Sequence, residues 1–327
     1  MVPGMTLNCP QGWNRRSPGF ALHRVHAAAG RRPGGCGPPA PGTKRGKGRM
    51  TTPVIDFHVH PIDYESYGQA TLEWIRDLQG EANWERMQKY ADPDAFCSLL
   101  AENGVDYAVV LAELSPAASG TCSNEYVAAF CAGREKLIPF CTVNPHLVPD
   151  GRTELRRLVQ THGFRGLKLY PTYNHFYPNA PLLYPLYAAA EELGLPVMLH
   201  TGSSVFRGSR LKYGDPLFLD DVAVDFPRLR ILLVHGGRGV WYDRAFLLTR
   251  LHENVYLEIA GLPPPKLLTY FPELDRVADK VIFGSDWPGL LDVAGNIKRI
   301  RALPLAEEVK EKILGGNAAR LLGIEEK

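Results

Sequence analysis

The sequence has no run of 18 apolar residues, no CxxC pair, and no acidic residue among its first 50 positions. Without an apolar run of that length, the chain offers no candidate for a membrane-spanning helix. Without paired cysteines, neither a zinc knuckle nor a thioredoxin-like redox site is indicated. The six cysteines are scattered, which suits a reducing compartment and predicts a cytoplasmic protein.

Charge is distributed unevenly along the chain. Residues 1–50 hold nine Lys or Arg, whereas the rest of the chain holds 28 basic and 35 acidic residues. A net-acidic body argues against nucleic acid as the main partner. Because residues 1–50 are rich in Gly, Pro and Arg, we expect a disordered extension there and one folded domain over residues 51–327. A transit peptide, or translation that starts at Met50, would explain the same composition.

Short apolar runs alternate with longer amphipathic segments through the rest of the chain. The runs cover residues 54–59, 105–111, 137–143, 164–169, 195–200, 230–235, 255–259 and 280–284. Apolar strands between helical segments are typical of a parallel sheet covered on both faces. Eight such repeats predict an α/β fold, a closed (β/α)₈ TIM barrel. The long segment 61–92 after the first run is expected to form a lid or a substrate wall.

Histidine and aspartate residues stand at the ends of several of these runs. His58 and His60 are two residues apart, so they point the same way from a strand. His200 ends the fifth run, His235 ends the sixth, and Asp286 follows the eighth. The carboxyl ends of barrel strands meet on the active-site face, so these side chains are expected to converge. The pattern predicts a metal centre rather than separate hydrogen-bonded core histidines.

Lys168 lies within the fourth run, between apolar neighbours. An ammonium group that points into the barrel is costly unless it is paired. Lys168 could bind an anionic substrate, carry a carbamate that bridges two metal ions, or face the outer helices and extend to water. The residues alone leave these three interpretations open.

Six motifs occur in the order expected for one enzyme family. They are DFHVH, GLKLYP, LHTG, VHGG, FGSDWP and GGNAARLLG. Together, over about residues 53–324, they resemble the amidohydrolase-related branch of the amidohydrolase superfamily, which includes enzymes like aminocarboxymuconate-semialdehyde decarboxylase. The resemblance implies a divalent metal, usually Zn²⁺, with Mn²⁺ or a second metal as alternatives. Its implied ligands are His58, His60, His200 and Asp286. His235 would be a catalytic acid or base, or a ligand of a second metal, and a homodimer is the expected assembly.

The ligand set favours a hydrolase as the first hypothesis. A bound zinc ion lowers the pKa of its water toward about 7, which makes hydroxide available. Asp286 would accept the proton of that water, and His235 would polarise the substrate carbonyl or hold the developing oxyanion. The substrate would be a small, carboxylated amide, ester or lactone.

The alternative hypothesis is a non-oxidative decarboxylase of an aromatic or muconate-like acid, because both chemistries occur in the family that the chain resembles. In either case, Tyr170, Arg207 and Trp287 are expected to contact the small-molecule substrate. Two other classes stay open. A PHP-type phosphoesterase also begins with HxH but usually carries further His and Glu ligands, and a non-catalytic barrel could bind metal without performing a reaction.

Overall fold

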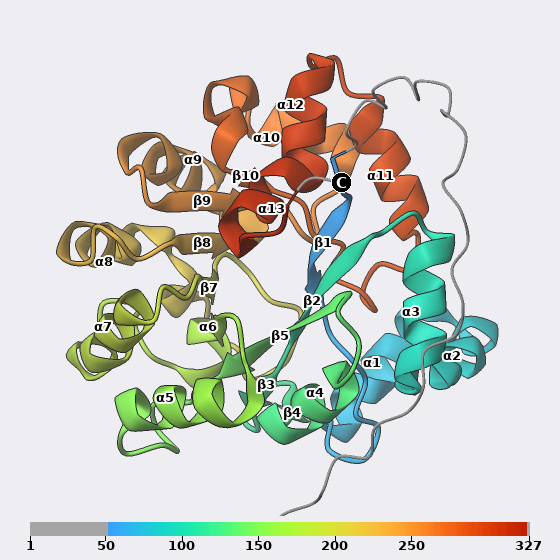
Figure 1. Cartoon of the computed structure of the whole chain (residues 1–327), viewed down its shortest axis with the longest axis horizontal. Helices are drawn as coiled ribbons and strands as arrows, with labels where there is room; N and C mark the ends of the chain where they lie inside the picture. The colour runs from blue at the N-terminus through green and yellow to red at the C-terminus, as the bar shows by residue number, and fades with distance from the viewer. Residues whose placement is uncertain (1–51, 326–327) are drawn as a thin grey trace, which may run out of the picture. The chain divides into compact units, whose positions relative to one another are not determined.

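The structure is a computed structural model that describes residues 52–325 of the chain. Its central sheet has eight parallel strands in the order β1-β2-β5-β6-β7-β8-β9-β10 (Figure 1). They are β1 (Ile55–Val59), β2 (Tyr107–Leu111), β5 (Leu137–Thr142), β6 (Leu167–Leu169), β7 (Val197–His200), β8 (Ile231–Val234), β9 (Val255–Glu258) and β10 (Val281–Ile282). Each strand lies inside one of the eight apolar runs, so the predicted barrel is confirmed. The extension predicted for residues 1–50 lies outside the described residues.

Backbone hydrogen bonds close the barrel between its first and last strands. Phe57 N donates to Phe283 O at 3.0 Å, and Asp286 N donates to His58 O at 3.0 Å. A further bond joins His60 N to Trp287 O at 2.9 Å. The loop that carries Asp286 is therefore fixed directly to the strand that carries the two histidines of the first motif.

The interior of the barrel is filled with apolar side chains. Its buried cluster comprises Ile55, Phe57, Val109, Leu111, Ile138, Phe140, Met198, Leu232, Val234, Ile282, Ala318, Ala319, Leu321 and Leu322. The last four belong to α13 (Asn317–Leu322), which lies across one end of the barrel in Figure 1. A packed interior of this kind leaves the carboxyl ends of the strands as the place for a site.

Helices surround the strands and form the outer layer, apart from α13 at the end of the barrel. They are α1 (Gln69–Gln79), α2 (Glu81–Gln88), α3 (Pro93–Glu102), α4 (Asn124–Cys131), α5 (Gly151–His162), α6 (Pro171–Asn174), α7 (Tyr184–Glu192), α8 (Leu219–Asp225), α9 (Tyr242–Leu251), α10 (Leu267–Tyr270), α11 (Val293–Arg301), α12 (Glu307–Glu311) and α13. Local signals set their ends: in α5, Asp150 accepts a hydrogen bond from Thr153 N, and Gly163 ends the helix at a φ of 70°. None of the helices within residues 52–325 is long and apolar enough to cross a membrane.

The long segment after β1 forms helices α1 and α2, and it contacts a hairpin that the sequence did not predict. The hairpin consists of β3 (Glu113–Ser115) and β4 (Gly120–Cys122), which pair in antiparallel orientation. Gly68 N donates to Ser119 O at 3.3 Å, next to the start of α1. Gly120 has a φ of 114°, and a Cβ there would lie 2.2 Å from Gly68 N. Glycine therefore permits the close approach that fixes α1 beside the barrel mouth.

Candidate metal centre and substrate cavity

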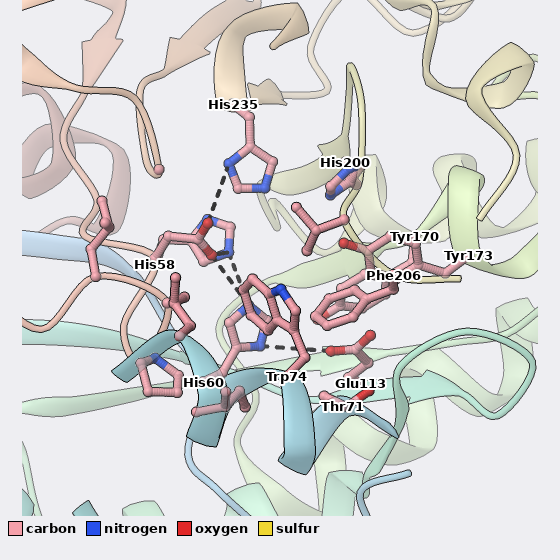
Figure 2. Close-up of a pocket in the computed structure, with 18 of the residues that line it drawn as sticks. His58, His60, Thr71, Trp74, Glu113, Tyr170, Tyr173, His200, Phe206 and His235 are labelled. Carbon is pink, nitrogen blue, oxygen red and sulfur yellow. Dashed lines mark hydrogen bonds and ion pairs between the residues drawn. The ribbon is translucent and has the colours of Figure 1, made fainter. Parts of the chain in front are cut away.

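Three predicted ligands, His58, His60 and Asp286, converge at the carboxyl ends of the strands. Figure 2 labels the two histidines. His58 Nε2 lies 3.1 Å from His60 Nε2. Asp286 Oδ1 lies 3.4 Å from His58 Nε2 and 3.9 Å from His60 Nε2. One nitrogen or oxygen from each side chain therefore falls within 4.8 Å of the other two, which suits a shared cation.

The backbone is strained at two of the predicted site residues. His235 has a φ of 63° and Asp286 has a φ of 65°, in the left-handed region that non-glycine residues rarely occupy. Such a conformation costs on the order of 1–3 kcal/mol and persists only where the surrounding structure enforces it. For Asp286 the enforcing contacts include the bond from its amide to His58 O and the bond from Gly289 N to its carbonyl at 2.8 Å.

Glu258 contacts the ring of His58 and the backbone amide of His235. Its Oε1 lies 3.2 Å from His58 Nδ1, and its Oε2 accepts the backbone N–H of His235 at 3.0 Å. A proton on His58 Nδ1 satisfies this contact and leaves the Nε2 lone pair directed at His60 and Asp286. A buried carboxylate that holds a ligand histidine in this way is a common support for a metal site.

Burial keeps the histidines in the form that binds metal. It lowers the pKa of His60 to about 3, and the charge of Lys168 acts in the same direction. Burial also lowers the pKa of His58, His200 and His235 well below its usual value. The rings are therefore neutral near pH 7, as metal coordination requires. The donor set and its protonation both fit a divalent cation.

His200 and His235 lie beside this cluster. Their ring centroids are 4.8 Å apart, and the His58 and His235 centroids are 5.1 Å apart. His200 Nε2 lies 3.3 Å from Ser203 O, and His235 Nδ1 lies 2.8 Å from Ala260 O. A ligand role for His200 stays a prediction. Two groups of side chains lie close enough to hold a metal ion, His58 with His60 and Asp286, and His58 with His235 and Glu258, and neither includes His200.

A cavity of about 250 Å³ opens above the cluster. Drug-sized ligands occupy pockets of roughly 300–1,000 Å³, so this cavity suits a small molecule. Its polar lining consists of His58, His60, Thr71, Glu113, Lys168, His200, His235, Arg238 and Asp286. Its apolar lining includes Ile62, Tyr67, Trp74, Ile75, Leu78, Tyr170, Tyr173, Val205, Phe206 and Leu290.

The apolar wall is largely aromatic. The Tyr173 ring lies 4.8 Å from the His200 ring and 5.7 Å from the Phe206 ring. Phe206 in turn meets Trp74 of α1 edge to face, with centroids 5.2 Å apart. Figure 2 shows Trp74 and Phe206 side by side among the residues that line the cavity. The segment predicted to form a lid or wall thus supplies a side chain to the cavity.

Two basic side chains, Arg238 and Lys168, line the cavity together with the converging histidines and Asp286. Arg238 Nη1 lies 3.5 Å from Asp286 Oδ2, while Arg238 Nη2 donates to Ser203 O at 3.1 Å. Lys168 is completely buried in the barrel mouth. Burial lowers the pKa of Lys168, and the nearby carboxylates of Glu258, Asp286 and Glu113 oppose that effect.

Two residues predicted to contact the substrate lie elsewhere. Arg207 is exposed and follows Phe206, whose own side chain turns into the cavity. Trp287 is buried against Phe96, with ring centroids 4.9 Å apart, because its backbone pairs with Val59 and directs the ring toward α3. Of the three predicted contacts, Tyr170 lines the cavity, while Arg207 and Trp287 are not among the lining residues.

Two acidic residues of the site were missed from the sequence. Glu258 ends strand β9, just as His200 ends strand β7. Glu113 begins β3, two residues after the end of β2. Both carboxyl groups are completely or almost completely buried. The rule that identified the histidines, a polar residue at the end of an apolar strand, would also have identified these two.

Similarity to known proteins agrees with this geometry. The family model described as Amidohydrolase matches residues 55–324. The chain is 27% identical over 253 residues to gamma-resorcylate decarboxylase of Rhizobium sp., which covers 62% of this chain and 75% of the relative. It is also 27% identical over 205 residues to 2-keto-4-carboxy-3-hexenedioate hydratase of Sphingobium sp., which covers 51% of this chain and 59% of that enzyme.

Solved structures share the fold. An uncharacterized TIM-barrel protein from Bordetella bronchiseptica has a TM-score of 0.68 at 24% identity, over 83% of this chain and 99% of that one. A 5-carboxyvanillate decarboxylase from Novosphingobium aromaticivorans, complexed with manganese and a nitrobenzoic acid derivative, has a TM-score of 0.57 at 15% identity, over 84% and 96%. Because the family model covers most of the sequence, the chain belongs to the Amidohydrolase family and is an enzyme of the amidohydrolase superfamily.

Proposed function

We propose that the protein is a metal-dependent, non-oxidative decarboxylase of a small aromatic carboxylic acid. The observation that carries this proposal is the cavity itself, in which His58, His60 and Asp286 converge beneath an aromatic wall that includes Tyr173 and Phe206. A flat aromatic acid can place its carboxylate at the polar base while its ring packs on that wall.

The relatives support decarboxylation more than hydrolysis. The residue pattern alone favours a hydrolase, because metal-activated water is the general chemistry of such a ligand set. The decarboxylases among the relatives act, by their names, on gamma-resorcylate and 5-carboxyvanillate. The hydratase among the relatives means that the family model alone does not select the reaction.

The proposed ligands of the divalent ion are His58, His60 and Asp286, with His200 as the fourth. When bound, the ion would act as a Lewis acid that holds the substrate carboxylate and stabilises its negative charge. Manganese accompanies the ligand in the solved decarboxylase, so Mn²⁺ and Zn²⁺ are both candidates here.

Asp286 is the proposed proton carrier. Its Oδ1 faces the two histidines, and its Oδ2 faces Arg238. Burial raises the pKa of Asp286, although Arg238 and Lys168 act against the rise, which favours the protonated form relative to an exposed aspartate. The proton passes from Asp286 to the ring carbon that bears the carboxylate. The bond to the carboxylate carbon then breaks, its electron pair returns to the ring, and CO₂ leaves; solvent restores the proton on Asp286.

The test is a panel of benzoic and hydroxybenzoic acids, incubated in D₂O with the full chain and added Mn²⁺ or Zn²⁺. We expect CO₂ release and one deuterium at the carbon that loses its carboxylate, and neither in Asp286→Asn. A parallel panel of lactones, esters and amides tests the hydrolase hypothesis. Hydrolysis of that panel without release of CO₂ from any acid would refute the proposal.

A further inference from the structure

Lys168 is a buried cation that lacks a hydrogen-bond acceptor among residues 52–325. Its neighbours Leu167 and Leu169 face the outer core, so strand alternation turns the lysine into the barrel mouth, where it lines the cavity. Its Nζ lies 5.1 Å from the centre of the Tyr170 ring, which offers a cation–π contact but no acceptor atom. A buried ammonium without a partner is costly, and a ligand atom that accepts from Nζ would remove that cost.

The nearby carboxylates that oppose the pKa shift of Lys168 already have other partners. Glu258 receives hydrogen bonds from His58 and from the amide of His235. Asp286 faces His58 and pairs with Arg238. None of the ion pairs within the described part of the chain involves Lys168, although the same carboxylates stabilise its charge from further away. The charge of the Lys168 ammonium is therefore stabilised by nearby carboxylates, but its N–H groups have no hydrogen-bond acceptor among the described residues.

Glu113 supplies an acceptor on the same cavity. Its Oε1 accepts from Ser119 Oγ in the β3–β4 hairpin, which fixes the carboxylate in place. Its Oε2 lies 3.8 Å from His60 Nδ1, which is longer than a hydrogen bond. Glu113 and Lys168 both line the cavity and affect each other's charge. Lys168 thus presents a donor and Glu113 an acceptor to the same cavity.

We propose that Lys168 and Glu113 form a recognition site for a hydroxyl group on the substrate, in addition to the carboxylate that is lost. Lys168 Nζ donates to the hydroxyl oxygen, and the hydroxyl donates to Glu113. A hydroxyl suits this pair because it accepts and donates at once. A second carboxylate would be attracted by Lys168 but has no proton to donate to Glu113, and an apolar substituent would leave both unpaired. The inference rests on the proposed function in taking the substrate to be an aromatic acid.

The test measures equilibrium binding rather than turnover, so it can fail or succeed independently of the decarboxylase proposal. The full chain, reconstituted with Mn²⁺, is titrated calorimetrically with benzoate, 3-hydroxybenzoate, 4-hydroxybenzoate and isophthalate. Hydrogen bonds to charged groups commonly alter affinity by about tenfold to a hundredfold. We therefore expect at least one hydroxybenzoate to bind about tenfold or more tightly than benzoate, and isophthalate to gain no such advantage.

Two lysine variants test whether Lys168 is the residue that recognises the hydroxyl group. Lys168→Met should abolish the preference for the hydroxyl, so that hydroxybenzoates and benzoate bind with about equal affinity. Lys212→Met is the matched control, because Lys212 is exposed and also lies over a tyrosine ring, 4.8 Å from the centre of Tyr213. It should leave all four affinities unchanged.

Several results would overturn the inference. One is a wild-type protein that does not distinguish hydroxybenzoates from benzoate, which can be observed even if Lys168→Met fails to fold. Another is an equal loss for every ligand in Lys168→Met, or an isophthalate preference that this change abolishes. A carbon dioxide adduct on Lys168, seen by mass spectrometry of the intact protein, would also contradict an ammonium role.

Discussion

Glu258→Gln tests whether the buried carboxylate controls which nitrogen of His58 is free to bind a metal. Both oxygens of Glu258 face nitrogen donors, at 3.2 Å from His58 Nδ1 and 3.0 Å from the amide of His235. Glutamine has one acceptor oxygen, so its NH₂ group must face one of those two donors. If it faces His58, the ring must place its proton on Nε2 and lose the lone pair that points at His60. If it faces His235, two donors meet and one hydrogen bond is lost.

The first arrangement of the glutamine would weaken metal binding, and the second would lower folding stability, so the two are measured separately. Loss of a supporting contact to a ligand histidine typically weakens metal binding about 10–100-fold. A buried donor left without an acceptor costs about 1–3 kcal/mol of folding stability. Competition with a chromophoric chelator gives the first quantity, and denaturant unfolding of the metal-free protein gives the second. Glu253→Gln is the control, because Glu253 lies just before strand β9 but is exposed. If Glu258→Gln changed neither quantity, the orienting role of Glu258 would be wrong.

Three more predictions rest on the geometry of the site. Gly261→Ala would place a Cβ 2.6 Å from Asp286 Oδ2, so we expect kcat/KM to fall about a hundredfold. Gly163→Ala is the control, because Gly163 has nearly the same positive φ but no atom within 4 Å of its added Cβ; it should lower folding stability and leave kcat/KM unchanged. Because the pKa of His60 is low in the folded protein, the unfolded chain binds a proton at a higher pH than the folded chain does. Acidification from pH 7 to pH 5 should therefore lower the free energy of unfolding of the metal-free protein by about 2 kcal/mol per such histidine. His60→Gln should make this free energy depend less on pH. Trp74→Leu removes part of the aromatic wall, so KM for an aromatic acid should rise about threefold to tenfold with kcat nearly unchanged; a large fall in kcat would mean that Trp74 does more than bind the ring.

The barrel could be predicted from the sequence because every strand is a short apolar run that needs burial on both faces. The β3–β4 hairpin could not, because its strands have three residues each and one of them contains Gly120. Its geometry depends on contact with Gly68, from a distant part of the chain, and no local pattern encodes that contact.

The site was predictable to the extent that strand ends reveal it. His58, His60 and Asp286 converge as their places after apolar strands suggest. The substrate contacts were harder to predict, because side chains in a loop do not alternate between two faces as they do along a strand. Phe206 turns inward while its neighbour Arg207 faces solvent, and the packing of Phe206 against Tyr173 and Trp74 decides between them.

The most direct test of the account joins metal content to the reaction. The full chain is stripped of metal and titrated with Mn²⁺ or Zn²⁺, while bound metal per chain and CO₂ release from the best aromatic acid of the panel are measured together. Activity that rises with the first equivalent of metal and is lost in both His58→Ala and Asp286→Asn is the predicted result. CO₂ release that is unaffected by removal of the metal, or by loss of those two side chains in a folded protein, would contradict it.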